Sequence, residues 1–161
     1  MKNKKMLHTL CIVTILLLAL GTYLLLLPKD HINNKLCKAT VSFELKKDNH
    51  EFKYKLFHRI RFSTEGKGSN HTRGVVIKDN EQYIIARTLS FNFLNKDNNN
   101  NYKAKIEEVR KTGQDTLPDA LASQYLSYLL PGSFIFFRTE EINNHLALIS
   151  GSQGPIFICS L

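Results

Sequence analysis

The sequence predicts a mainly β protein that follows one N-terminal membrane anchor. Apolar and polar residues alternate with a period of two through most of residues 40–160, which is typical of strands with one buried face. Near the N-terminus, one continuous apolar run has the length of a membrane-spanning helix. The chain has 161 residues, so about one globular domain remains after the anchor.

The first predicted element is the anchor over residues 6–27. As a helix it would rise about 33 Å, close to the roughly 30 Å hydrocarbon core of a bilayer. Lys2, Lys4 and Lys5 precede it, so the positive-inside rule places residues 1–5 in the cytoplasm and the following residues outside. The alternative is a cleaved signal peptide, whose apolar region is shorter, roughly 7–15 residues. We therefore predict a retained single-pass anchor, a linker over residues 28–36 and a domain over residues 37–161 outside the cytoplasm.

The net charge of +8 is divided between the two parts of the chain. Residues 1–36 carry five Lys and one Asp, and residues 37–161 carry seventeen Lys/Arg and thirteen Asp/Glu, so each part contributes half. The densest basic stretch, residues 46–73, is interrupted by Asp48, Glu51 and Glu65. It is typical of a solvated sheet face, and direct binding of nucleic acid is not predicted.

Eight segments after the anchor have the alternation of strands. They are residues 40–46, 52–62, 73–78, 82–94, 102–107, 133–139, 145–150 and 155–160. Residues 66–70 are predicted to interrupt the sheet, residues 79–80 to form a turn, residues 95–101 a hairpin loop and residues 151–154 a hairpin.

One helix is predicted between the fifth and sixth strands. Residues 116–119 resemble a capping box, with Asp119 in place of the usual Glu or Gln and Pro118 in the first turn. An apolar stripe at helical spacing follows, and Pro131 and Gly132 end it. The stripe comprises Leu117, Leu121, Tyr125 and either Leu129 or Tyr128. Such stripes most often pack on a core.

No βαβ alternation is present, so the sheet is predicted to be antiparallel, either a barrel around a small ligand or a sandwich. In a closed barrel of eight sequential strands, the start of the first strand lies beside the end of the last. Cys37 and Cys159 occupy these two places, and outside the cytoplasm they can form a disulfide at the membrane-proximal rim. The alternative is two unpaired buried thiols. Cys11 lies within the anchor, where it acts as a small apolar residue.

The sequence holds no recognisable catalytic, metal-binding or nucleotide-binding motif, and we predict no enzyme activity, no metal and no cofactor. A ligand cavity is the remaining possibility, with His58, Arg87, Phe91 and Tyr54 as candidate lining residues. Each has a plainer alternative, because His58 and the aromatic residues are more often core residues and Arg87 is more often paired structurally.

The layout resembles the FidL-like membrane proteins of enteric bacteria. The resembling features are the Lys-rich start with one anchor, Cys37 just after it, the segment Tyr83-Ile84-Ile85-Ala86-Arg87, and the ending Pro155-Ile156-Phe157-Ile158-Cys159. The resemblance implies a small protein of the bacterial inner membrane with a periplasmic domain. By analogy with ToxS, it also implies a lipocalin-like barrel and a partner, a membrane-bound ToxR-like transcription regulator.

Two functions therefore remain open. The first is an accessory or sensory partner of such a regulator, embedded in the lipid bilayer. The second is a membrane-tethered binder of a small apolar ligand, such as a bile salt, without a protein partner.

Overall fold

The structure is a computed structural model that describes residues 12–23, 32–47, 50–63, 65–97 and 99–161. The chain divides into two compact units, Met1–Asp30 and His31–Leu161. The second unit begins inside the predicted linker over residues 28–36. Ile32, within that linker, is 2% exposed and belongs to the core of the second unit.

In the first unit, residues 12–23 are helical and their side chains are exposed. Within the described residues, no helix combines the length and the apolarity needed to cross a membrane. Residues 6–11 and 24–27 of the predicted anchor, and the predicted cytoplasmic tail over residues 1–5, lie outside the described residues.

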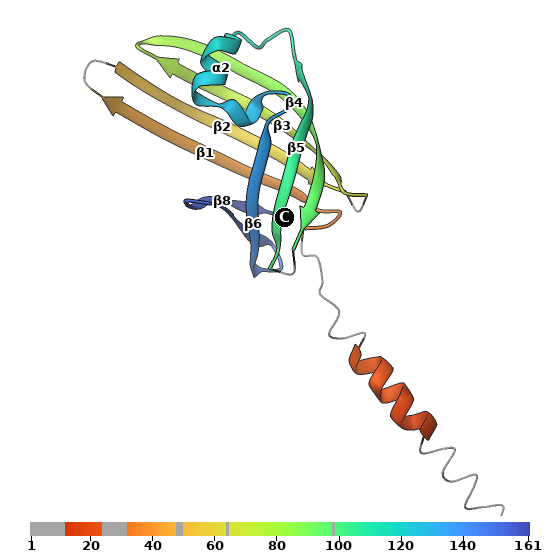
Figure 1. Cartoon of the computed structure of the whole chain (residues 1–161). Helices are drawn as coiled ribbons and strands as arrows, with labels where there is room; N and C mark the ends of the chain where they lie inside the picture. Colours follow the sequence, from red (N-terminus) through yellow and green to blue (C-terminus); the bar gives the residue numbers. More distant parts are fainter. Residues whose placement is uncertain (1–11, 24–31, 48–49, 64, 98) are drawn as a thin grey trace, which may run out of the picture. The chain divides into compact units, whose positions relative to one another are not determined.

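The second unit is a closed barrel of eight antiparallel strands in sequence order, and it confirms the predicted mainly β fold (Figure 1). The barrel form, not the sandwich, is adopted. Its strands are β1 (Leu36–Lys47), β2 (His50–Phe62), β3 (Lys67–Lys78), β4 (Glu81–Lys96), β5 (Asn101–Lys111), β6 (Phe134–Asn143), β7 (Leu146–Gly151) and β8 (Gly154–Ser160). Between β5 and β6 lie the helix α2 (Asp119–Tyr125) and the 3₁₀ helix η1 (Ser127–Leu129).

The predicted alternation places the core inside the barrel. On β2 and β4, residues of one parity are buried or half-buried, and their neighbours, except the buried Ala86, are exposed or half-buried. The buried residues include Phe52, Leu56 and Phe62 from β2, and Ile85, Leu89 and Phe91 from β4. Tyr125 of α2 stacks on Phe52 with ring centroids 4.0 Å apart, so the helix packs on the core as predicted.

Turn chemistry explains the β3–β4 hairpin. Asp79 and Asn80 both adopt positive φ, at 49° and 69°, which is the conformation of a tight hairpin turn that Asn and Asp tolerate. The Asp79 carboxylate accepts a hydrogen bond from the Glu51 backbone N–H and contacts the side chains of Lys78 and His50. These contacts, led by the one from Lys78, hold the pKa of Asp79 well below its usual value. The turn predicted at residues 79–80 is confirmed.

The predicted interruption at residues 66–70 is wrong, because β3 already begins at Lys67. Only Gly66, at φ 72°, has a turn conformation. Gly68 lies within the strand, and a Cβ atom there would be 2.3 Å from the Phe91 ring. This glycine therefore makes room for an aromatic side chain and does not break the sheet.

The predicted capping box does not form. The first helical residue is Asp119, the N-cap is Pro118, and no side chain caps the helix. Thr116 instead accepts a hydrogen bond from the backbone N–H of Ile84, at 2.8 Å. The hydroxyl that the capping-box pattern assigned to the helix therefore bonds to β4. Of the predicted stripe, Leu117 precedes α2, Leu121 and Tyr125 lie in α2, and Leu129 lies in η1.

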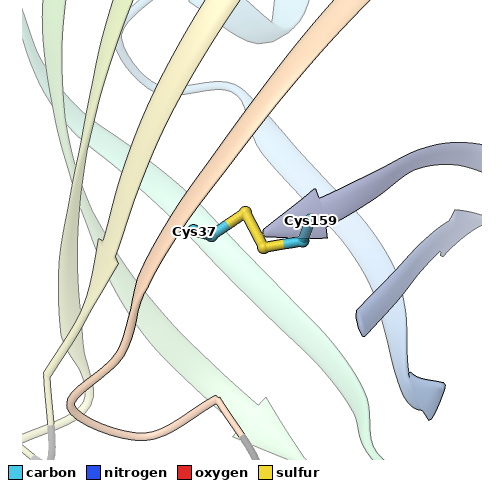
Figure 2. Close-up of a disulfide and its surroundings, with 2 residues drawn as sticks. All are labelled: Cys37 and Cys159. Atoms are coloured by element: carbon cyan, nitrogen blue, oxygen red, sulfur yellow. A yellow bond between two sulfur atoms is a disulfide. The ribbon is translucent and has the colours of Figure 1, made fainter. Parts of the chain in front are cut away.

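The barrel closes between β1 and β8. Their register consists of one position, Lys38 opposite Ser160. Beside it, Cys37 and Cys159 form a disulfide with their Cα atoms 5.2 Å apart. Figure 2 shows the arrowhead of β8 ending beside β1 at this bridge. The predicted disulfide between the first and the last strand is confirmed.

Candidate ligand cavity

The barrel holds a cavity of about 250 Å³, just below the usual range for small-molecule sites, roughly 300–1,000 Å³. Its wall is built by β1 to β8 and η1, and most of its lining is apolar. The aromatic lining residues are Tyr54, Phe62, Phe91, Tyr128, Phe137 and Phe157. The charged side chains Lys, Arg, Asp and Glu are absent from the described lining.

A small polar group lies in this wall. His58 and Asn70 line the cavity, and the buried Thr72 lies behind them. Nδ1 of His58 is 3.0 Å from Oγ1 of Thr72 and 3.2 Å from Nδ2 of Asn70. Because an amide nitrogen can only donate, Nδ1 accepts and the proton of the neutral imidazole lies on Nε2.

Two hydrogen-bonding atoms of this group remain unused. Nε2–H of His58 has no hydrogen-bond acceptor among the described residues, and Oδ1 of Asn70 is a buried acceptor without a donor. A buried polar atom without a partner costs free energy, commonly about 1–3 kcal/mol. The cavity wall therefore holds one unused donor and one buried unused acceptor among otherwise apolar residues.

Burial keeps the titratable side chains of the cavity wall uncharged. It lowers the pKa of His58 to about 4, and the hydrogen bond with Asn70 offsets only a part of that effect. Burial also raises the pKa of Tyr128, and the nearby Tyr54 raises it further. At neutral pH the cavity is consequently uncharged, which suits a neutral or weakly polar ligand group.

The structure brings three of the four candidate cavity residues together and places the fourth elsewhere. Tyr54, His58 and Phe91 line the cavity. Arg87 is not among the lining residues. Sequence reasoning also missed Asn70, because it lies in the stretch predicted to interrupt the sheet. The inward parity of β3, once β3 is extended to Lys67, would have found it.

Arg87 forms a buried ion pair with Asp115. Its Nε and Nη2 donate to the two carboxylate oxygens of Asp115, at 2.9 Å and 3.2 Å, and Nη2 also donates to the Leu117 carbonyl. The side chains are 1% and 0% exposed. Asp115 also accepts from the Ala86 backbone N–H. The pair joins the segment before α2 to β4. Arg87 is therefore paired structurally, which was the alternative to its predicted role in the cavity.

The cavity lining extends to both strands of the seam between β1 and β8. Val41 from β1 lies on one side of it, and Ile156 and Phe157 from β8 lie on the other. Past Lys38, β1 pairs with β2 up to Lys47 but has no described pair with β8. The seam therefore leaves one edge of each strand unpaired beside the cavity.

No group of three or more His, Cys, Asp or Glu side chains that could hold a metal occurs among the described residues. A search of curated proteins found no match to the chain. The model of one protein family, described as "FidL-like putative membrane protein", matches residues 74–159. The match runs from β3 to Cys159 in β8 and covers more than half of the chain. The chain therefore belongs to the FidL-like family of membrane proteins.

Proposed function

We propose that this chain is a single-pass protein of the bacterial inner membrane that serves as an accessory, sensory partner of a membrane-bound ToxR-like transcription regulator. Residues 6–27 are its anchor, residues 1–5 lie in the cytoplasm and the barrel lies in the periplasm. The apolar run, the preceding lysines and the membrane family support this topology. The Cys37–Cys159 disulfide agrees with an oxidising compartment.

The observation that carries the partner role is the open seam. An unpaired strand edge presents N–H and C=O groups to which another strand can add. Here two such edges, residues 40–47 of β1 and residues 154–158 of β8, both contribute residues to the cavity lining. A strand from a partner could pair with both and cover the cavity.

Apolar side chains accompany the open edge. Phe43 and Leu45 of β1 have the inward parity of Cys37 and Ala39, yet they are 45% and 47% exposed. Phe43 stacks on Tyr54, a residue of the cavity wall, with ring centroids 5.4 Å apart. A partner that covered Phe43 and Leu45 would bury apolar surface next to the ligand, which would couple ligand binding to partner binding.

Site-specific photo-crosslinking tests this proposal in native membranes. A photoreactive residue replaces Phe43 in the full-length tagged protein, and the products are identified by mass spectrometry. The matched control carries it at Ile84 of β4, which is also 45% exposed. We expect one membrane-anchored transcription regulator to be captured from position 43 and not from position 84. Equal capture at both positions, or none at either, would contradict the seam as the partner site.

A second candidate function is a membrane-tethered carrier or sensor of a small apolar ligand without a protein partner. The specific observation in its favour is the uncharged cavity with the unused His58 and Asn70 atoms. An anionic ligand such as a bile salt would keep its acidic group at the seam, because the described lining offers no cation.

Thermal unfolding of the full-length protein in lipid nanodiscs tests this candidate, with bile salts, fatty acids and fatty alcohols as probes. A free ligand concentration of a hundred times Kd stabilises the folded state by about 2.7 kcal/mol. The Asn70→Leu variant should weaken the shift, whereas Asn92→Leu, on a neighbouring strand outside the lining, should not. No stabilisation by any probe would exclude this candidate while leaving the partner role intact.

A further inference from the structure

The outer face of the barrel carries a basic hollow that neither proposed function uses. It is lined by Phe57, Arg59 and Arg61 of β2, by Ser69, His71 and Arg73 of β3, and by Leu36 of β1. Acidic side chains are absent from this described lining. The sequence placed these cations in one long basic stretch with acidic interruptions, but the fold separates them from the acids.

Strand register explains the separation. Glu51 and Asp79 lie at the other end of β2 and β3, where Lys53 pairs with Glu51 and Lys78 with Asp79. Lys38, which borders the hollow on β1, stands opposite Arg59, and within the hollow Phe57 stands opposite Arg73. Like charges directly opposite each other on neighbouring strands are destabilising.

Within the described residues, the arginines of the hollow and the neighbouring Lys38 are also unpaired. Among the described residues, Lys38, Arg59, Arg61 and Arg73 have no carboxylate within ion-pair distance. By contrast, the exposed Arg110 on β5 is held by both oxygens of Glu108. A concentration of unpaired guanidinium groups, with the Ser69 hydroxyl on the strand position opposite Arg61, matches the oxygens of a phosphate group.

We propose that this hollow binds the phosphate headgroups of anionic lipids. The argument for a lipid is the place of the hollow in the chain. Leu36, in its wall, is the first residue of β1, and only residues 28–35 separate it from the predicted anchor. Eight residues span at most about 28 Å, so the hollow stays within reach of the bilayer surface. The proposal rests on the membrane anchor of the proposed function.

Docking of the hollow onto lipid would orient the barrel on the membrane. Each Lys or Arg near an anionic surface favours the docked state by roughly fivefold. The exposed Phe57, at 41%, would enter the headgroup region beside the arginines. The seam lies on the other edge of β1, away from β3, and stays free for a partner strand.

The experiment uses a single tryptophan as reporter, because the natural sequence has none. Full-length Phe57→Trp protein is placed in nanodiscs of phosphatidylcholine, with and without phosphatidylglycerol, and a spin label on the lipid headgroup serves as quencher. We expect phosphatidylglycerol to increase the quenching. The combined Arg59→Gln, Arg61→Gln and Arg73→Gln changes should abolish the increase. Loss of the same charge by Lys46→Gln, Lys47→Gln and Lys53→Gln, at the far end of the hairpin, should leave it unchanged.

Three outcomes would overturn the proposal. One is equal quenching in neutral and anionic discs, and another is equal loss in the two triple variants. The third is a change in the emission of the reporter tryptophan on adding inorganic phosphate to neutral discs, with no response to anionic lipid. Incorporation into the discs reports the anchor separately, so failure of the hollow is distinguished from failure of the proposed topology.

Discussion

At the scale of single residues, His58 links the cavity to pH. The neutral imidazole belongs to the hydrogen-bonded group with Thr72 and Asn70, and its burial disfavours the charged form. The pKa of His58 is about 4 in the folded barrel, against 6.5 for the unperturbed group. The unfolded chain therefore binds a proton at a higher pH than the folded barrel does.

The sign of the resulting pH dependence follows directly. Above pH 6.5 His58 is neutral in both states, and between pH 6.5 and about 4 only the unfolded state is protonated. The free energy of unfolding should fall as the pH falls through this window, by about 2 kcal/mol between pH 7 and pH 5. Urea unfolding at the two pH values measures it. His58→Gln should remove this part of the pH dependence, and Thr72→Val, which keeps the imidazole, should retain it. Equal pH dependence in the wild type and His58→Gln would refute the assignment.

Arg87 shows how a candidate ligand residue can serve the fold. The alternation of β4 correctly predicted its inward parity, but the buried partner Asp115 lies 28 residues further along the chain, in an irregular segment. No local sequence pattern predicts an ion pair between residues this far apart. The prediction of a cavity role therefore had to stay open until the fold placed both groups together.

Breaking this pair should be costly. Arg87→Met leaves the Asp115 carboxylate buried without its cation, and such changes typically destabilise a protein by about 3–5 kcal/mol. Adding Asp115→Asn should recover part of the loss, because the remaining group is neutral. The exposed pair Arg110–Glu108 is the control, and Arg110→Met should leave the urea midpoint near that of the wild type. A midpoint for Arg87→Met as high as that of Arg110→Met would be inconsistent with a structural pair.

At the scale of elements, the alternation of apolar and polar residues predicts the strands. The two errors in the predicted elements come from contacts between segments that are far apart in sequence. The period of two located all eight strands, because each buries one face in the barrel. The alternation missed the start of β3, where Gly68 leaves room for the Phe91 ring. The capping-box pattern was wrong at α2, because the Thr116 hydroxyl accepts a hydrogen bond from β4 instead. Both errors arise at residues whose partners are remote in sequence.

Gly74 provides a test of such close contacts between elements. A Cβ atom at this position would lie 2.1 Å from the backbone oxygen of Lys55 and 2.9 Å from Cα of Leu56, so β2 or β3 would have to move. Gly74→Ala should therefore lower the free energy of unfolding by about 1–3 kcal/mol. The matched change Gly113→Ala has nothing within 4 Å and should be neutral or slightly stabilising. Denaturant unfolding of the two variants gives the comparison, and equal stabilities would mean that the strands adapt without cost.

At the scale of the whole molecule, two cysteines predicted that the first and last strands meet. Nothing in the sequence predicted that these strands would pair at only one described position. An even number of sequential strands places Cys37 and Cys159 side by side, and the structure joins them. The separation of β1 and β8 beyond Lys38 depends on the twist and length of every strand between them. The unpaired length of this seam is for this reason a property of the folded barrel alone.

We consequently expect the disulfide to stabilise the contact between β1 and β8 more than any other part of the barrel. The bridge joins residues 122 positions apart, and in the chain-entropy model such a loop contributes about 5 kcal/mol. Reduction, or Cys37→Ser with Cys159→Ser, should lower the thermal midpoint of the full-length protein, whereas Cys11→Ala should leave it unchanged. Since only one ladder position would remain between β1 and β8, amide exchange should rise first in β8 and along residues 36–47, ahead of β2 to β4. Uniform exchange across all strands after reduction would instead mean that the barrel opens as one unit, and that the seam is no weaker than the rest of the sheet.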